Sequence, residues 1–415
     1  MSKIDKLIQQ YCPDGMEYVK LGDCIISLKT GLNPRQNFKL NVEGSVCPYI
    51  TGKDIYNDMI NTSSKTDMIT PEAVQIINRR SQLECGVLLF ASTGTGTVGR
   101  MAIVKEYNND WNISETLYAI KPKSNLQSSF LKYYLGSKTA IAQYEGKISK
   151  GSVPHLKVSD LLNVLIPLPP LPIQEEIVRI LDTFSELQAE LQAELQARQL
   201  QYQYYRDQLF RFDGRKDIKC KKLGDVGTII RGNGLQKKDF TETGVGCIHY
   251  GQIYTKYGAF TDKTLTFVEE SLATHLLQVE KGNLVIACTS ENVEDICKCV
   301  AWLGDENICT GGHACVFRHN QNPKYIAYFF QTEQFYKQKK KYVYGTKVMD
   351  IKPDSIAKIE IPLPSLEEQE RIVSILDKLY TLTHDLSKGI PAEIEARKQQ
   401  YEYYRDKLLT FKIKN

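Results

Sequence analysis

The sequence predicts an α+β fold: two mixed α/β globules in a pseudo-two-fold arrangement, separated by an antiparallel coiled coil of two long helices. Three observations carry this prediction. Residues 173–213 contain no Gly or Pro and carry an apolar stripe, which is typical of one long helix. A second copy of that segment lies near the C-terminus, and the same short motif opens the region before each copy. Internal repetition on this scale indicates a tandem duplication.

The chain of 415 residues is long enough for two or three domains. The repeat divides it into globule, helix, globule and helix. The expected boundaries are 1–165 for the first globule, 166–212 for the first helix, 213–360 for the second globule and 361–415 for the second helix.

The first long helix follows a proline-rich entry, Ile-Pro-Leu-Pro-Pro at 166–170, because proline cannot continue a strand ladder. Apolar residues then recur at steps of three and four, among them Leu187, Leu191 and Leu195. At about 1.5 Å per residue, roughly 38 residues would span about 57 Å, too long for one small domain. Such a helix needs a partner helix.

The second copy supplies that partner. Residues 361–377 repeat residues 166–182 with 12 of 17 identities, and residues 397–408 repeat residues 198–209 with 8 of 12. The two offsets, 195 and 199, differ by 4, so the second helix carries four extra residues.

The second helix has its own apolar seam, at Leu382, Leu386 and Ile394. It also contains Gly389 and Pro391, which predict a kink near the inserted turn, because proline breaks the helical hydrogen-bond ladder. A regular helix is therefore expected beside a bent one.

The two globules share a pattern but little identity. Lys-Leu-Gly-Asp opens both, at 20–23 and 222–225, and residues 85–91 match residues 281–287 at an offset of 196. Helices are expected at 3–10, 129–144 and 323–337, and short strands in the first globule at 48–50, 86–91, 102–104 and 117–120.

Composition points to an ordinary soluble protein, with 42% hydrophobic and 25% charged residues. The net charge of +4 gives no global field, so any nucleic-acid surface must be local. No apolar run of 18 residues and no signal-peptide core is present, which favours a cytoplasmic location without a membrane partner. The 11 scattered cysteines are then expected to be reduced thiols.

The doubled Ile-Pro-Leu-Pro entries, the two Tyr-Tyr-Arg-Asp exits and the two Lys-Leu-Gly-Asp openings resemble the DNA-specificity subunits of type I restriction–modification systems. The resemblance covers essentially the whole chain. It implies that the globules at 1–165 and 213–360 are target-recognition domains, each reading one part of a bipartite double-stranded DNA target. It also implies docking of two methyltransferase subunits around the coiled coil, together with restriction subunits. In such a complex this chain is non-catalytic and binds no cofactor, and S-adenosylmethionine is expected on the methyltransferase.

A tetrapeptide tandem in the first helix, Glu-Leu-Gln-Ala three times over residues 186–197, suggests a ruler. Each tetrad lengthens a helix by ~6 Å and turns it by ~400°. A base pair adds about 3.4 Å and about 35° of twist. Rotation thus matches about one base pair per tetrad, and the resemblance implies the same role for such tetrads. Good helix-forming composition alone explains the residues chosen but not their threefold identity.

Basic segments in equivalent places of both globules are the first candidates for DNA contact, although a solvated helix end would look alike. A glycine-rich loop at 92–100 and residues after the second Lys-Leu-Gly-Asp add to them. The candidates in the first globule are Lys147, Lys150, Ser152, Thr93, Thr95, Thr97 and Arg100, with Arg35 and Lys53 as secondary ones. Those in the second are Lys339, Lys340, Lys341, Tyr342, Tyr344, Thr346 and Lys347, with Arg231, Lys237 and Lys238 as secondary ones.

Two other motifs are interpreted as decoys. Gly94, Gly96 and Gly99 form G-x-G-x-x-G, but a dinucleotide site needs a helix after the last glycine, and Met101–Val104 predicts a strand. Cysteines 297, 299, 309 and 315 surround His313, but the Cys-Lys-Cys spacing is too close for a zinc knuckle. No metal site is therefore expected.

Two alternatives to a specificity subunit stay open. One is an enzyme acting on DNA through a dispersed catalytic site, which would methylate or cleave DNA alone. The other is a coiled-coil scaffold without nucleic acid, which would show no salt-dependent retention on DNA.

Overall fold

The computed structural model describes residues 2–385 and 387–414, and these residues form two compact units. Unit 1 comprises residues 1–190 and 395–415, and unit 2 comprises residues 191–394. Each unit therefore contains one globule together with parts of both long helices. Within the described residues, no helix combines the length and apolar character needed to cross a membrane.

Unit 1 holds a four-stranded sheet of order β2-β10-β7-β8, a three-stranded sheet β6-β3-β9, and the pairs β1-β11 and β4-β5. Its strands are β1 Tyr18–Lys20, β2 Ile25–Thr30, β3 Cys47–Ile50, β4 Ile55–Tyr56, β5 Met59–Ile60, β6 Asp67–Ile69, β7 Leu88–Ala91, β8 Met101–Ile103, β9 Asn112–Ile113, β10 Leu117–Pro122 and β11 Leu165–Pro167. Its helices are α1 Lys3–Tyr11, α2 Pro34–Asn37, α3 Pro71–Asn78, α4 Ser128–Leu135, α5 Lys138–Tyr144 and α6 Val158–Leu162, with short 3₁₀ turns η1 Leu21–Cys24, η2 Gly52–Asp54 and η3 Glu145–Lys147.

Unit 2 repeats that plan with a five-stranded sheet β13-β22-β18-β20-β15, a four-stranded sheet β16-β14-β21-β17, and the pairs β12-β24 and β19-β23. Its strands are β12 Lys219–Lys222, β13 Gly227–Arg231, β14 Val245–Ile248, β15 Phe260–Thr261, β16 Thr266–Val268, β17 Leu277–Val279, β18 Leu284–Ala287, β19 Thr289–Ser290, β20 Cys299–Trp302, β21 Ile308–Thr310, β22 Ala314–His319, β23 Met349–Asp350 and β24 Glu360–Leu363. Its helices are α8 Leu223–Val226, α9 Tyr250–Thr255, α10 Glu270–Ala273, α11 Pro323–Phe329, α12 Glu333–Lys339, α13 Pro353–Ile356 and α14 Leu366–His384, with the 3₁₀ turn η4 Lys237–Asp239.

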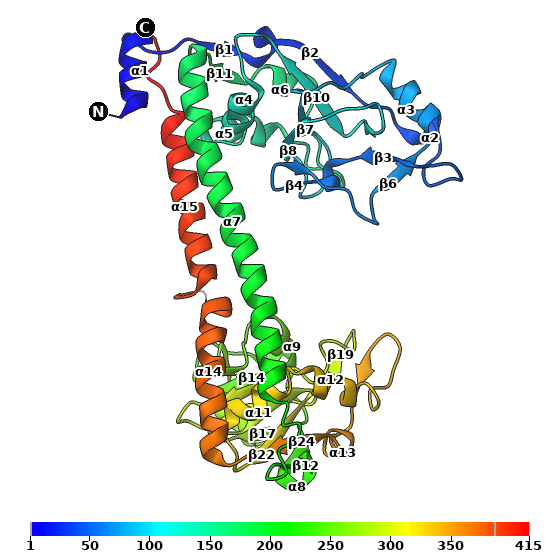
Figure 1. Ribbon diagram of the computed structural model, residues 1–415, viewed down its shortest axis with the longest axis vertical. Coiled ribbons are helices and arrows are strands. Elements are labelled where there is room, and N and C mark those ends of the chain that lie inside the picture. The colour runs from blue at the N-terminus through cyan, green and yellow to red at the C-terminus, as the bar shows by residue number, and fades with distance from the viewer. Residues whose placement is uncertain (1, 386, 415) are drawn as a thin grey trace. The chain divides into compact units, whose positions relative to one another are not determined.

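The long helix α7 is continuous from Leu171 to Leu209, as the absence of Gly and Pro predicts. Its start leaves the globule of unit 1, and the end of α15, Ile390–Leu408, arrives there, so the two run in opposite directions (Figure 1). Inside unit 1 they meet through the stacked rings of Phe184 and Tyr404, 5.5 Å apart. Inside unit 2 the end of α7 packs on α14, where Tyr202 lies 6.0 Å from Tyr380.

The second long segment is broken, as Gly389 and Pro391 predict. It forms α14, which ends at His384, and α15, which begins at Ile390. A Cβ at Gly389 would lie within 2.7 Å of the carbonyl oxygen of Leu382, so only glycine fits this close approach.

Of the predicted seam residues that the structure describes, none is fully buried. Leu187, Leu191, Leu195 and Ile394 are half-buried, and Leu382 is exposed. Leu386 lies outside the described residues. The buried cores are instead inside the globules, where Ile177 and Leu181 of α7 and Ile372 and Leu376 of α14 join them.

Two helices expected from the sequence are each split in two. The expected helix at 129–144 breaks between α4 and α5, because Ser137 caps a new helix by accepting a hydrogen bond from the backbone amide of Ala140. Thr332 does the same for α12 through the amide of Phe335. Both units contain this break, which creates a fresh helix N-terminus at each site.

Candidate DNA interface

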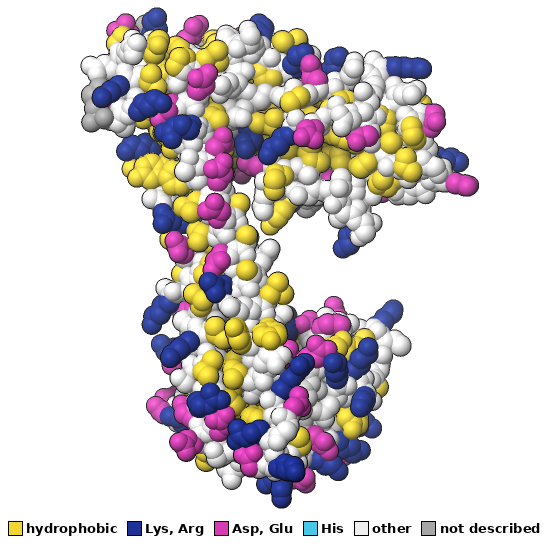
Figure 2. Space-filling view, viewed as in Figure 1, with side chains coloured by type: hydrophobic (Ala, Val, Ile, Leu, Met, Phe, Trp, Pro, Cys, Tyr) yellow, Lys and Arg dark blue, Asp and Glu magenta, His cyan; other side chains and the backbone are white. Residues whose placement is uncertain are grey.

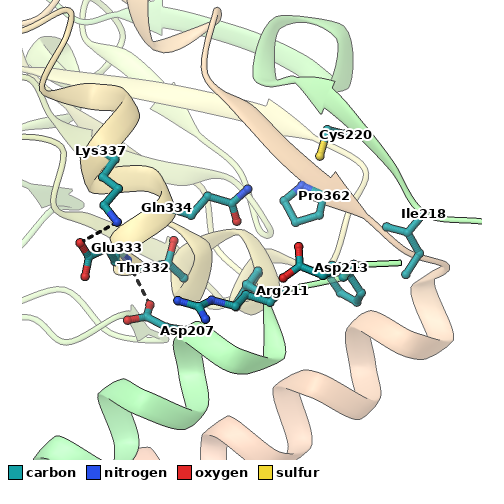
Figure 3. A pocket seen from close by; sticks show the side chains of 12 residues that line it. Asp207, Arg211, Asp213, Ile218, Cys220, Thr332, Glu333, Gln334, Lys337 and Pro362 are labelled. Atoms are coloured by element: carbon teal, nitrogen blue, oxygen red, sulfur yellow. Dashed lines mark hydrogen bonds and ion pairs between the residues drawn. The ribbon is translucent and has the colours of Figure 1, made fainter. Parts of the chain in front are cut away.

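The joint between long helix and globule is built in the same way in both units. In unit 2, Asp207 near the end of α7 accepts a hydrogen bond from the backbone amide of Glu333, the first residue of α12, at 3.0 Å (Figure 3). In unit 1, Asp406 near the end of α15 accepts one from the amide of Lys138, the first residue of α5, at 3.2 Å. The aspartate of each Tyr-Tyr-Arg-Asp motif therefore binds the N-terminus of α12 or α5, the helix starts that the sequence pattern did not predict.

A second pair of contacts fixes the start of each long helix. Tyr133 donates a hydrogen bond to Asp182 in unit 1, and Tyr328 donates one to Asp377 in unit 2. Burial, followed by the neighbouring carboxylate, raises the pKa of both phenols well above the ordinary value. These tyrosines thus remain protonated donors.

In unit 2 the joint borders a cavity of about 360 Å³ (Figure 3). Arg211 and Asp213 from the chain after α7 line it together with Gln334 and Lys337 of α12. The Lys337 ammonium reaches Glu333 at 3.1 Å, so the charges beside the cavity are partly paired.

Two basic loops follow this joint, residues 145–155 (loop 1, unit 1) and residues 340–350 (loop 2, unit 2). Each begins just after α5 or α12. Each then returns to pair with the segment that follows the central strand of its unit's main sheet, β7 in unit 1 and β18 in unit 2. Loop 1 does so through a bridge between His155 and Thr93, and loop 2 through the pairing of Asp350 with Thr289. The equivalence expected from the alignment of the two basic segments is therefore present in the backbone.

Most of the predicted phosphate-contact residues in these loops are exposed, which leaves them available to a polyanion. The exposed ones are Lys147, Lys150 and Ser152 in loop 1, and Lys340, Lys341, Tyr344, Thr346 and Lys347 in loop 2. Tyr342 is half-buried and packs on the core of unit 2. On the face shown in Figure 2, Lys and Arg are interspersed with Asp and Glu, consistent with a local surface and not a broad field.

The prediction that Lys339 contacts phosphate is wrong. Only 4% of Lys339 is exposed, and its ammonium donates hydrogen bonds to the carbonyl oxygens of Glu294 and Ile296 at 2.9 and 2.5 Å. Burial lowers its pKa, as expected for a cation removed from water. Because Lys339 ends α12 on the same side as buried Phe335, helical periodicity turns it inward while Lys340 and Lys341 stay outside.

Arg231 holds loop 2 and offers no free guanidinium. Both terminal nitrogens bond the carboxylate of Asp350, at 2.8 and 2.5 Å, and Nε donates to the carbonyl oxygen of Gly312 at 3.2 Å. The expectation of a direct phosphate contact is therefore replaced by a positioning role: Arg231 fixes the end of loop 2 against β13.

The glycine-rich loop turns most of its polar side chains inward. Thr97 donates to the backbone of Thr93, and Arg100 donates to the carbonyl oxygen of Ile55 at 3.1 Å. Of the four residues of this loop predicted to contact DNA, Thr93, Thr95, Thr97 and Arg100, only Thr95 is exposed. Strand β8 begins at Met101 directly after this loop, which confirms the strand and leaves no helix for a dinucleotide phosphate.

The secondary candidates occupy equivalent places after the first strand of each main sheet. Arg35 lies exposed on α2 after β2, and Lys237 and Lys238 lie exposed on η4 after β13. Lys53 is paired with Asp67 at 3.0 Å.

The cysteine cluster consists of buried thiols. Burial raises the pKa of Cys297 and Cys309 to about 12, so both sulfurs stay protonated near neutral pH. All 11 cysteines are free, as the sequence predicts.

Two histidines contact the threonines that follow β7 and β18, a pairing that the sequence did not reveal. Nδ1 of His155 lies 2.7 Å from the hydroxyl of Thr93, and Nδ1 of His313 lies 3.0 Å from the hydroxyl of Thr289. The two threonines match at the offset of 196, but the histidines come from different elements. No spacing in the sequence could have paired them.

Known proteins share this organisation. A family model described as the type I restriction modification DNA specificity domain matches the chain twice, over residues 13–198 and 215–396. A putative type I restriction enzyme specificity subunit of Haemophilus influenzae is 30% identical over 339 residues, covering 78% of this chain and 82% of that protein. The EcoR124I/EcoR124II specificity subunit of Escherichia coli is 32% identical over 245 residues, covering 58% of this chain and 60% of that protein.

A solved chain from a study of complex assembly and conformational transition of the type I R-M system shares the fold, with a TM-score of 0.64 and 17% identity. The match covers 95% of this chain and 97% of that chain. The two family matches span most of the sequence and one falls on each repeat. The chain therefore belongs to the type I restriction–modification DNA specificity family, as a non-catalytic DNA-recognition subunit that works in complex with other subunits.

Proposed function

We propose that each globule reads one half of a bipartite double-stranded DNA target, while the repeated helices carry the methyltransferase subunits. The observation that carries this is the duplicated joint, in which Asp207 and Asp406 clamp equivalent helix starts. The joint is repeated in detail, whereas loops 1 and 2 differ in sequence and charge. A repeated scaffold with divergent loops suits one kind of partner and two different half-sites.

Loops 1 and 2 supply the phosphate contacts in this proposal. Lys147 and Lys150 in unit 1, and Lys340, Lys341 and Lys347 in unit 2, are exposed and near polar side chains that can orient on a duplex. Neutralising phosphates releases counterions, so affinity falls as salt rises.

Two methyltransferase subunits would dock on surfaces that the repeat makes alike. Tyr204 near the end of α7 is 59% exposed, and its equivalent Tyr403 near the end of α15 is 60% exposed. Exposed aromatic side chains are frequent energetic centres of protein interfaces. Restriction subunits join the same assembly, and S-adenosylmethionine binds to the methyltransferase while this chain binds no cofactor.

The test is single-molecule sequencing of methylated bases in cells that express the chain with its methyltransferase subunit. The expected result is one methylated motif made of two fixed half-sites around an unspecified spacer. Methylation or cleavage of DNA by the purified chain with S-adenosylmethionine would instead support an enzyme. The absence of salt-dependent DNA retention would support a scaffold.

A further inference from the structure

Both units contain a histidine whose orientation is fixed by a threonine at the end of the central strand. Thr93 and Thr289 each lie two residues beyond the end of their strand, β7 and β18 respectively. Their partners come from different places, because His155 ends loop 1 while His313 directly precedes β22. The same contact has therefore been built twice with different chain segments.

The hydrogen-bond pattern in unit 1 favours one of the two tautomers of a neutral His155 ring. The Ser92 hydroxyl donates to the carbonyl oxygen of Thr116 at 2.9 Å, so in its 3.2 Å contact with Thr93 it can only accept. The Thr93 hydroxyl then gives its proton to Ser92, and its oxygen accepts from Nδ1–H of His155. The outer nitrogen, Nε2, is left with a lone pair and acts as an acceptor.

Unit 2 reaches the same tautomer through a carboxylate. Burial works to raise the pKa of Asp350, but hydrogen bonds from Arg231 and its positive charge outweigh burial and hold the pKa below its ordinary value. The ionised carboxylate can only accept, so the Thr289 hydroxyl donates to it at 3.4 Å. The Thr289 oxygen then accepts from Nδ1–H of His313, and Nε2 of His313 is an acceptor.

Both histidines are at least partly open to solvent, as a side chain that reads a base must be. His313 is exposed, and its ring packs 4.8 Å from that of Tyr250. His155 is half-buried, and its backbone amide donates to the Ser149 hydroxyl at 3.0 Å, which ties the ring to loop 1. Among the described residues, no group donates a hydrogen bond to Nε2 of either ring.

We propose that His155 and His313 are specificity-determining residues, each reading one base pair of its unit's half-site. The unprotonated Nε2 accepts a hydrogen bond from the exocyclic amine of adenine or cytosine, the two amines that bases present in the major groove. This inference rests on the proposed function that each globule reads one half-site. It adds which residue reads, and which chemical group is read.

The experiment maps methylated motifs for the full chain with its methyltransferase subunit, using the variants H155N and H313N. Asparagine keeps a polar atom near the position of Nδ1 but has none at the position of Nε2. H155N is expected to relax one fixed position in one half-site by roughly tenfold or more in discrimination, and H313N one position in the other. The longer variants H155Q and H313Q place an amide oxygen farther out and are expected to keep more of that preference.

His275 provides the matched control, since it is an exposed histidine of unit 2 outside this cluster, and H275N should leave every letter unchanged. Unchanged letters in both H155N and H313N, or a uniform loss of methylation across both half-sites, would overturn the proposal. A wild-type chain that directs methylation to no bipartite motif would contradict the proposed function instead, so the two failures are distinguishable.

Discussion

At the scale of single residues, the lysine run at the end of α12 shows that neighbouring charges need not share a surface. Lys339 bonds two backbone carbonyl groups inside unit 2, whereas Lys340 and Lys341 are exposed at the start of loop 2. The run therefore has two functions, one in stability and one in solvent-facing charge.

Reversing the two exposed charges, in K340E/K341E, should weaken DNA binding broadly across sequences. The slope of log affinity against log salt is negative, and each lost phosphate contact makes it shallower by about 0.9, so its magnitude should decrease by up to about two. Titration of the complex with DNA at several salt concentrations measures it.

Two controls sharpen that experiment. K281E, at an exposed lysine paired with Asp305, should leave the slope unchanged. K339E should instead lower the melting temperature, because a carboxylate cannot donate to the carbonyl oxygens of Glu294 and Ile296. A salt slope unaltered in K340E/K341E would remove loop 2 from the DNA surface.

His319, at the end of β22, makes unit 2 sensitive to acid. Burial lowers its pKa to about 4, and its buried Nε2 has no hydrogen-bond partner. The unfolded histidine titrates near 6.5 and so binds more protons than the folded one between about pH 4 and 6.5. Stability from the neutral ring is complete above about pH 6.5 and falls as pH drops to about 4.

The expected loss is about 3 kcal/mol at most, since each pKa unit is worth about 1.4 kcal/mol. Denaturant unfolding at pH 7 and pH 4.5 measures it. H319N retains an acceptor for the backbone amide of Gln321 but cannot titrate, so its stability should depend less on pH. Equal pH dependence in the variant and the wild-type chain would show that other groups control the acid response.

At the scale of elements, the joints depend on one carboxylate each. Asp207 and Asp406 satisfy a backbone amide in the first turn of α12 or α5, a donor that lacks a partner inside its own helix. Each negatively charged carboxylate also interacts favourably with the positive end of the helix dipole.

D207A should open the first turn of α12 and destabilise it by about 1 kcal/mol, as loss of a helix cap does. Hydrogen exchange should then speed up by roughly fivefold at the amide of Glu333. The amide of Lys138 in unit 1 serves as the internal control, and D406A should reverse the pattern. Faster exchange at both amides in either variant would mean that the two joints do not act locally.

The elements were predictable where a periodic pattern or a proline decides them. The continuous α7 and the break before α15 follow from the positions of Gly and Pro. The split of the expected helix at 129–144 was not predicted, because Gly136 and Ser137 are tolerated in a helix and only the capping hydrogen bond of Ser137 decides between the two outcomes. The backbone amide of Lys138, at the start of the new helix, binds Asp406, which is 268 residues away in the sequence. No local pattern can predict such a contact.

At the scale of the whole molecule, the duplication was readable from the sequence, but the recognition chemistry was only partly so. The basic loops were found because both globules carry lysines at one offset. Lys339 and Arg231 were misjudged, since their partners, the carbonyl oxygens near Glu294 and the carboxylate of Asp350, are set by tertiary packing. The threonine-held histidines were missed because only the threonines repeat.

Spacing between the half-sites is the property that one stretch of the chain is expected to set. The three tetrads of residues 186–197 lie inside the continuous α7, so deletion of Glu186–Ala189 removes a full turn plus about 40° and about 6 Å of helix. About 35° separates successive base pairs, so the preferred spacer should shorten by about one base pair. Both half-sites should keep their letters, because loops 1 and 2 are untouched. Methylation mapping of the deletion variant measures this, and Q192E, which keeps the length, should retain the original spacer. A deletion that altered half-site letters, or left the spacer unchanged, would show that α7 does not measure the gap.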